Sequence, residues 1–256
     1  MNLNGSSPVA NRPIFSTSSM RVAVRVAMVF WVSLLLAGCQ ALGTSGINLI
    51  SVEEEWELGE QFEAELAQEL DPHEDPMITR IGERIVAETR KADLPWRFYV
   101  VEDESINAFN VPGGLVYLHS GLIEQASDGE IAAVIGHEVG HGVARHGTQR
   151  MTQQYGLSIL AGAVLGEDPG VISEIVAQIV AGGTIAQFSQ AQEFEADDLG
   201  VRFLDDAGYD PEGMVALLER FLALQETDPG QMQQFFATHP STEERLERVR
   251  EQIRDM

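Results

Sequence analysis

The pentapeptide His137-Glu138-Val139-Gly140-His141 constrains this chain more than any other stretch, because its spacing has chemical meaning only on an α-helix. With about 3.6 residues per turn, positions i and i+4 share a face, so two imidazoles four residues apart can bind one metal ion. Glu138 lies beside that face, where it is a poor ligand but can take a proton from a metal-bound water. The pattern predicts half of a catalytic zinc site.

The residues around the pentapeptide favour a helix. Ser127 and Glu130 have the spacing of a capping box, in which each side chain binds the other residue's backbone N–H. Apolar residues then recur at every fourth position, at Ile131, Ile135, Val139 and Val143. The pattern predicts one buried helix from Ser127 to about Arg150. A motif this short also arises by chance, and the helical setting is what favours a metal site over that alternative.

The third zinc ligand does not follow directly in the sequence. A metzincin site needs glycine and histidine three and six residues after the second ligand, and Ala144 and Gly147 stand there instead. His146 is one residue too early, and on a continuous helix it lies about half a turn round from His137. A metzincin site is therefore excluded, and His146 is predicted to be a surface or internally satisfied histidine.

A carboxylate from a later helix is the other source of a third ligand. No acidic residue occurs between Glu138 and Glu167. Glu193 and Asp197 are four residues apart on one helix face, whereas Glu195 points away from both. One of the two carboxylates can bind zinc while the other accepts the free N–H of a ligating histidine. A solvated acidic helix face has the same pattern, so the spacing alone leaves both interpretations open.

Four blocks of sequence together resemble the family of zinc metalloendopeptidases that includes HtpX and the CAAX prenyl proteases, most closely its soluble periplasmic branch with LoiP and BepA. In chain order the blocks are Asn107-Ala108-Phe109 through Pro112-Gly113-Gly114 to Ser120-Gly121-Leu122; the histidine pentapeptide; Ser189 to Gly200; and Thr238-His239-Pro240 followed by Arg245. The resemblance spans about Glu53 to Arg254. It implies an α+β, mostly helical, gluzincin-type domain with a small antiparallel or mixed sheet beside the zinc helix.

The resemblance also implies a role for each site residue. One Zn²⁺ per chain would be held by His137, His141 and Glu193, with Glu138 as general base. Asp197 would orient a histidine or assist proton transfer. His239 would lie near the metal, as a movable fourth ligand or as a stabiliser of the developing oxyanion.

The activity implied by the resemblance is zinc-dependent endoproteolysis in the bacterial cell envelope. Its substrates would be unfolded or misassembled envelope proteins, and the outer-membrane assembly machinery is a candidate partner. Two alternatives remain open: a chaperone or assembly factor whose proteolysis is dormant because His239 caps the zinc, and a zinc exopeptidase.

Substrate binding is expected at a strand before the zinc helix. Three segments are predicted to be strands: Trp96 to Glu102, Ile106 to Val111 and Leu115 to His119. The hypothesis is that Asn107, Ala108 and Phe109 lie on an edge strand facing the cleft, where an extended peptide can pair with the main chain. In the alternative, these strands are fully paired and pack beneath the helix.

The amino terminus has the pattern of a lipoprotein signal peptide. Arg21 and Arg25 precede an apolar run, Val26 to Leu36, that is too short for an ordinary membrane span. Leu36-Ala37-Gly38-Cys39 resembles the bacterial lipobox, which implies lipidation of Cys39, the only cysteine. Gln40 then suggests a periplasmic protein anchored in the inner leaflet of the outer membrane. The alternative is a retained anchor with an incidental cysteine.

These signals divide the chain into an extension and signal peptide over residues 1–38, a linker over 39–52 and a metallopeptidase domain over 53–256. After removal of residues 1–38 the chain has 13 basic and 40 acidic residues, a net charge of −27. Such a charge excludes nucleic acid as a natural partner. A single cysteine also excludes an internal disulfide.

The remaining segments are predicted to be scaffold helices. They cover Glu53 to Leu70, Met77 to Arg90, Tyr155 to Leu165, Val171 to Phe188, Glu212 to Gln225 and Ser241 to Arg254.

Overall fold

The computed structural model describes residues 48–156, 162, 169–182, 187–228, 230, 235, 237, 239–240 and 243–256. All of these belong to one compact unit, Gly46–Met256. The predicted signal peptide, Cys39 and most of the linker lie outside the described residues, as do Thr238 and most of the predicted helix 155–165. Among the helices that are described, none combines the length and apolar character needed to cross a membrane.

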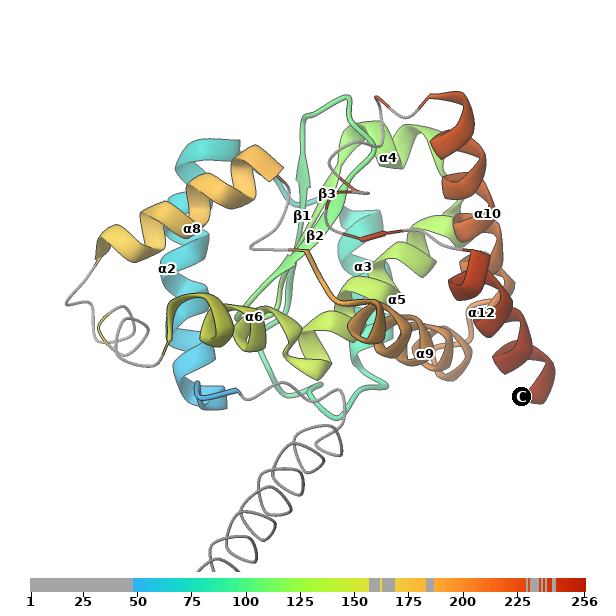
Figure 1. Cartoon of the computed structure of the whole chain (residues 1–256), viewed down its shortest axis with the longest axis horizontal. Coiled ribbons are helices and arrows are strands. Elements are labelled where there is room, and N and C mark those ends of the chain that lie inside the picture. The colour runs from blue at the N-terminus through green and yellow to red at the C-terminus, as the bar shows by residue number, and fades with distance from the viewer. Residues whose placement is uncertain are drawn as a thin grey trace, which may run out of the picture. The chain divides into compact units, whose positions relative to one another are not determined.

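Three strands form a small mixed sheet at the centre of this unit (Figure 1). They are β1 (Arg97–Val101), β2 (Ala108–Val111) and β3 (Leu115–His119), in the spatial order β1-β3-β2. β1 runs parallel to β3, and β2 runs antiparallel to it. The predicted strand positions are therefore correct to within two residues, and β2 is an edge strand of the sheet.

The turn between β2 and β3 requires glycine at two positions. Gly113 and Gly114 have φ angles of 93° and 77°, in the region that other residues rarely adopt. Gly113 also lies directly against Gly59 of the helix α2 (Val52–Leu70). A side chain at Gly59 or at Gly113 would clash with the other residue and push α2 off the sheet.

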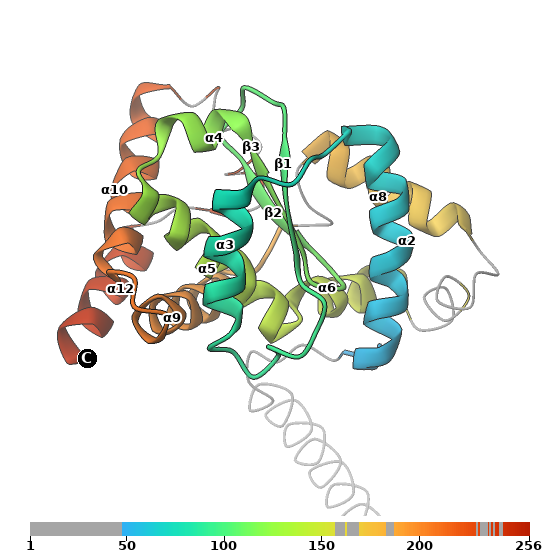
Figure 2. The same cartoon turned by 180° about the vertical axis from the view of Figure 1, so that it is seen from behind.

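Helices cover both faces of the sheet, and every residue of β2 and β3 is buried, whereas Arg97 of β1 is exposed and Tyr99 is half-buried. α2 and α8 (Pro169–Gly182) lie on one face, and α3 (Pro76–Val86) and α5 (Asp128–Ala144) on the other (Figures 1 and 2). Successive residues of β3 alternate between the two cores: Tyr117 packs with Phe62 and Ile175, whereas Leu118 packs with the apolar side of α5. This double cover explains why all five residues of β3 are buried.

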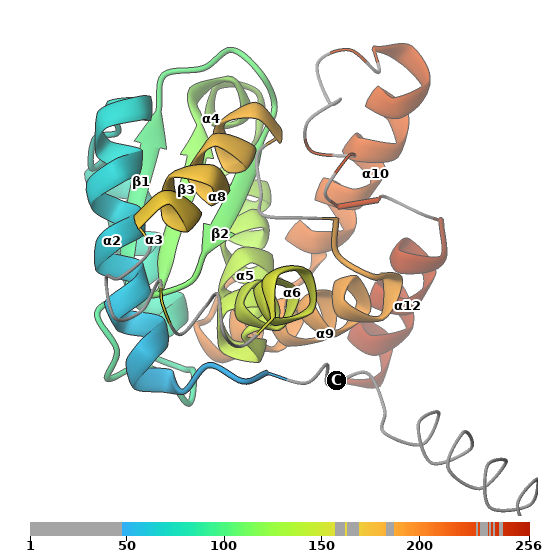
Figure 3. The ribbon, with the colours of Figure 1, turned by 60° about the vertical axis from the view of Figure 1, so that its left-hand side comes forward.

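Two further helices, α9 (Gln190–Asp206) and α10 (Glu212–Thr227), pack against α5 on the side away from the sheet. A third helix, α12 (Glu243–Asp255), packs on α9 and α10 (Figure 3). The capping box at Ser127 and Glu130 is present, and the predicted apolar stripe is buried. The stripe understates the burial, because every residue from Glu130 to Val143 is buried. α5 is thus a central helix rather than an amphipathic one.

The helix that carries the histidine pentapeptide, α5, ends earlier than predicted. α5 stops at Ala144, Arg145 adopts a left-handed conformation (φ 61°, ψ 36°), and a new helix, α6 (His146–Tyr155), begins. The cause is long-range: the Arg145 guanidinium pairs with Glu55 and donates to the carbonyl oxygens of Ile50 (2.6 Å) and Ser51 (2.8 Å). Contacts at the start of α2 therefore pull the chain out of the helix.

The other helices mostly follow their predicted positions. α2, α10 and α12 begin and end within two residues of the prediction. α8 is described to Gly182, and residues 183–186 of its predicted range lie outside the described residues. α3 ends at Val86 and not at Arg90, because the Thr89 hydroxyl and N–H both bind the carbonyl oxygen of Val86 and turn the chain. A short helix, α4 (Ser120–Gln125), links β3 to α5.

Candidate active site

Four buried side chains converge beside α5. They are His137 and His141 of α5, Glu193 of α9 and His239, and each offers a potential ligand atom within 4.8 Å of the others. The structure thus brings together the two histidines of the pentapeptide, a carboxylate whose role the spacing alone left undecided, and the histidine that the family resemblance placed near the metal.

A glycine within the pentapeptide lets α9 come close enough to contribute its carboxylate. A Cβ atom on Gly140 would lie 2.7 Å from the carbonyl oxygen of Ala196, well inside normal contact. Ala196 lies between Glu193 and Asp197 on the face of α9 that meets α5. Close packing at this point therefore sets the distance between the carboxylates and the histidines.

His137 is supported by a charged network. Its Nδ1 lies 2.9 Å from Asp197 Oδ1, and both oxygens of Asp197 accept hydrogen bonds of 2.7 Å from Arg245. Arg245 also lies 2.7 Å from Glu193 Oε2. Burial would raise the pKa of the Asp197 carboxyl, but Arg245 outweighs it and the pKa is lowered. The sequence alone predicted no role for Arg245, although this residue belongs to the fourth of the blocks that resemble the protease family.

His141 is supported by a second histidine. Its Nδ1 lies 2.8 Å from Nδ1 of His146, and both side chains are fully buried. Burial lowers the pKa of His146 and holds that of His141 well below its ordinary value, so both rings are neutral near pH 7. The surface alternative predicted for His146 is wrong, because the break at Arg145 turns the chain back toward His141.

The four-residue group suits a divalent metal ion. With Nδ1 of His137 bound to Asp197 and Nδ1 of His141 bound to His146, the two Nε2 atoms face each other 3.1 Å apart. Glu193 Oε1 lies 3.4 Å from His141 Nε2. Neutral rings that carry their protons on Nδ1 present bare lone pairs at Nε2, which repel unless a cation lies between them. Nitrogen and carboxylate donors of this kind suit Zn²⁺.

Electrostatics keep the third candidate ligand ionised. Burial would raise the pKa of Glu193, but His239 and Arg245 outweigh it and hold the pKa well below the ordinary value. The pKa of His239 shifts the other way: burial lowers it, whereas Glu193 and Glu138 raise it more strongly. His239 Nδ1 lies 3.0 Å from Glu193 Oε1, so the two groups are in direct contact.

Glu138 is buried next to the same group. Its side chain is 0% exposed, and neither carboxyl oxygen has a hydrogen-bond partner in the described part of the chain. The nearest cationic candidate is His239, whose Nε2 lies 3.7 Å from Glu138 Oε1. A buried carboxylate without a partner is costly, so its presence here points to a functional role.

Two aromatic rings cover the group. The ring of Phe188 stacks on His141 with 4.0 Å between centroids, and the ring of Phe235 stacks on His239 at 4.9 Å. Together with the packing of α9, these rings account for the burial of all four candidate ligands.

Comparison with known proteins identifies the family. Residues 72–253 match the model of Peptidase family M48, which is well over half of the chain. This chain belongs to peptidase family M48. The resemblance seen in the four sequence blocks is thereby confirmed, as is the mostly helical α+β fold with a small mixed sheet.

Several curated proteins are similar to this M48 chain over much of its length. The Beta-barrel assembly-enhancing protease of Yersinia pestis is 29% identical over 235 residues, covering 84% of this chain and 47% of that protein. The Mitochondrial metalloendopeptidase OMA1 of Schizosaccharomyces pombe is 34% identical over 179 residues, covering 68% and 51%. Metalloprotease YcaL of Escherichia coli is 31% identical, covering 62% and 63%. This chain spans about half the length of the first two relatives.

The three residues expected to bind substrate lie at and just before the edge strand of the M48 domain. Ala108 and Phe109 belong to β2, and Asn107 precedes it. All three are buried, and the Phe109 ring stacks on Tyr117 in the core shared with α2. Both polar side-chain atoms of Asn107 lack a hydrogen-bond partner within the described residues.

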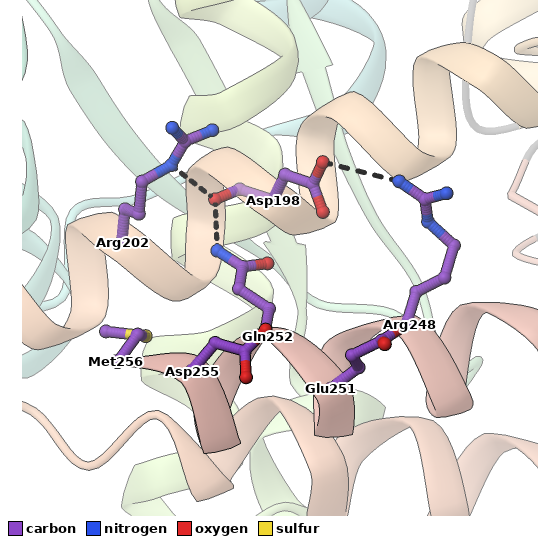
Figure 4. A pocket seen from close by; sticks show the side chains of 7 residues that line it. All are labelled: Asp198, Arg202, Arg248, Glu251, Gln252, Asp255 and Met256. Atoms are coloured by element: carbon purple, nitrogen blue, oxygen red, sulfur yellow. Dashed lines mark hydrogen bonds and ion pairs between the residues drawn. The ribbon is translucent and has the colours of Figure 1, made fainter.

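A pocket lies between α9 and α12 (Figure 4). It is lined by Asp198, Arg202, Arg248, Glu251, Gln252, Asp255 and Met256. Asp198 contacts both arginines of the pocket. Its carboxylate lies 3.6 Å from Arg248, and its backbone carbonyl oxygen accepts a 2.9 Å hydrogen bond from Arg202. The pocket shares no residue with the candidate active site.

Proposed function

We propose that this chain is a zinc-dependent endopeptidase of the bacterial cell envelope that removes unfolded or misassembled envelope proteins. The observation that carries the proposal is the buried set of His137, His141 and Glu193 with the unpartnered carboxylate of Glu138 beside it. Membership of peptidase family M48 supports the reaction class. One relative is named for enhancing β-barrel assembly, which supports envelope proteins as substrates and the outer-membrane assembly machinery as a partner.

The residues divide the work of peptide hydrolysis among them. His137, His141 and Glu193 would hold one Zn²⁺ per chain. The metal, when bound, would polarise the peptide carbonyl and lower the pKa of a water toward about 7. Glu138 would take the proton of the attacking water and return it to the leaving amine. Asp197 would fix the ring of His137, and His239 would donate a hydrogen bond to the oxyanion.

The edge strand supplies a binding surface for an extended peptide. His119 N–H donates to Asn107 C=O (3.0 Å), and antiparallel pairs alternate, so Asn107, Phe109 and Val111 bond to β3. The main-chain groups of Ala108 and Asn110 then point away from β3. A substrate strand would pair there, with the Asn107 amide as a further polar contact and Phe109 holding the strand in place.

The decisive experiment compares casein cleavage and zinc content in three purified proteins: wild type, Glu138→Gln and Glu69→Gln. Glu69 is an exposed glutamate of α2 and controls for the loss of one charge. We expect one zinc ion per chain in all three, and a loss of cleavage on the order of 10³-fold or more only in Glu138→Gln. Equal cleavage by wild type and Glu138→Gln would disprove the assignment. Mass spectrometry of the products distinguishes internal cleavage from trimming of one end by an exopeptidase.

A second candidate function is a chaperone or assembly factor whose proteolysis is dormant. Its support is the position of His239, which lies among the candidate ligands and leaves all of them buried. In that case the His239→Ala variant would cleave casein faster than wild type. If His239 instead stabilises the oxyanion, the variant would cleave casein more slowly.

The proposed location rests on the amino-terminal sequence. Lipidation of Cys39 would anchor the protein to the membrane, on the periplasmic side of the outer membrane. Labelling of cells with radioactive palmitate should mark the wild type and not Cys39→Ser. Membrane fractionation should then find the Cys39→Ser protein released from the outer membrane.

A further inference from the structure

The break between α5 and α6 places His146 directly behind a candidate metal ligand. The Nδ1 atoms of His141 and His146 are 2.8 Å apart, and His146 is 0% exposed. On the far side of His146, Nε2 lies 3.5 Å from Oε2 of Glu195, whose side chain is 43% exposed. The three side chains therefore form a line from the metal-binding group to the protein surface.

The geometry fixes where the protons lie along this line. Nε2 of His141 faces Nε2 of His137 (3.1 Å) and Glu193 Oε1 (3.4 Å), so Nε2 is the ligand atom and the proton of His141 is on Nδ1. That proton can go only to Nδ1 of His146, which must then accept. A neutral imidazole that accepts at Nδ1 carries its own proton on Nε2, and that atom faces Glu195.

We infer that His146 is a positioning residue for the metal site: it accepts the Nδ1 proton of His141 and fixes that ring in the tautomer that ligates through Nε2, with the Glu195 carboxylate 3.5 Å from its own Nε2. The inference rests on the metal site proposed above. Histidine ligands generally donate their second N–H to such a partner, and loss of the partner costs about 10- to 100-fold in metal affinity.

The two ligating histidines would then differ in their support. His137 donates to Asp197, an ionised carboxylate held by Arg245, whereas His141 donates to a neutral ring. A carboxylate partner makes the ligand more basic than a neutral partner does. His146 contributes mainly by fixing orientation, so a neutral acceptor of similar shape should replace it.

The test measures zinc affinity by competition with a chelator for wild type, His146→Leu and His146→Asn. The side-chain oxygen of asparagine can accept where Nδ1 does, whereas leucine fills the site without an acceptor. We expect affinity to fall about 10- to 100-fold in His146→Leu and to stay within about threefold of wild type in His146→Asn. Unchanged affinity in His146→Leu, or an equal loss in both variants, would overturn the inference. Failure of wild type to bind zinc would instead refute the proposed function.

A second measurement needs no variant. In zinc-loaded wild type labelled with ¹⁵N-histidine, the chemical shifts should show a proton on Nδ1 of His141 and on Nε2 of His146. A proton on Nδ1 of His146 would overturn the inference, even if His146→Leu does not fold.

Discussion

At the scale of single residues, Arg245 pairs with Asp197 and Glu193 at once while only 2% of its surface is exposed. Removing it leaves two buried carboxylates without their cation. We expect Arg245→Ala to lower the free energy of unfolding of the metal-free protein by about 3–5 kcal/mol. Urea unfolding measures this. Arg248→Ala is the matched control on the same helix, since its 3.6 Å pair with Asp198 is half-exposed and should contribute under about 1 kcal/mol.

Glu130 predicts a pH dependence of stability. Burial would raise its pKa, but Arg220 and the hydrogen bonds of Ser127 lower it to about 2 from an ordinary 4.5. A carboxyl with a lowered pKa stabilises the fold above the higher value and loses that contribution as the pH falls toward the lower one.

Glu130→Gln should therefore be less stable than wild type at pH 7. We expect the loss in the free energy of unfolding to be only about 2 kcal/mol, because solvent around the partly exposed Arg220 weakens the ion pair. The difference should shrink between pH 4.5 and 2. Urea unfolding at pH 7 and pH 3 measures it, and a difference that stays constant would contradict the pairing.

Residues of the site differ in how far the sequence could predict them. His137, Glu138 and His141 follow from helical spacing alone, because they are neighbours on one helix. The choice of Glu193 over a solvated acidic face needed the family resemblance, since the contact joins residues far apart in the chain. His146 and Arg245 had no local signal, because their partners come from the α5–α6 break and from the packing of α12.

At the scale of elements, the α5–α6 joint depends on a residue in a strained conformation. Arg145 has φ 61°, which costs a residue with a Cβ about 1–2 kcal/mol relative to glycine. Arg145→Ala and Arg145→Gly both lose the contacts with Ile50, Ser51 and Glu55, and they differ only in this conformational cost. We expect both to be destabilised, and the alanine variant to be less stable than the glycine variant by about 1 kcal/mol in thermal or urea unfolding. The opposite order would contradict a left-handed joint.

Periodicity predicted most elements correctly because burial and spacing agree in them. β3 and the starts of α2 and α10 lie within one residue of their predicted positions. The prediction failed where a distant contact ends a helix that the local sequence would continue. The example is α5, which ends at Ala144 because Arg145 binds the chain just before α2. Complete burial of α5 was also missed, because an apolar stripe reveals one covered face and not the small residues that let α9 pack on another.

At the scale of the whole molecule, the candidate ligands are enclosed, so metal exchange should depend on the aromatic cover. The Phe188 ring stacks on His141 at 4.0 Å, and such stacking contributes about 0.5–1.5 kcal/mol. We expect Phe188→Ala to release metal to a chelator roughly 2- to 10-fold faster than wild type. Phe194→Ala is the control, since that ring lies under Arg248, 4.4 Å away. Equal release rates in the two variants would show that Phe188 does not gate the metal.

The contacts of Arg145 have an evolutionary consequence. Two of its three acceptors, at Ile50 and Ser51, are backbone carbonyls, which any residue provides. Only Glu55 contributes a side chain. Positions 55 and 145 should therefore change together among descendants of this chain, whereas positions 50 and 51 are constrained by other contacts, since Ile50 is buried in the core and the Ser51 side chain caps α2.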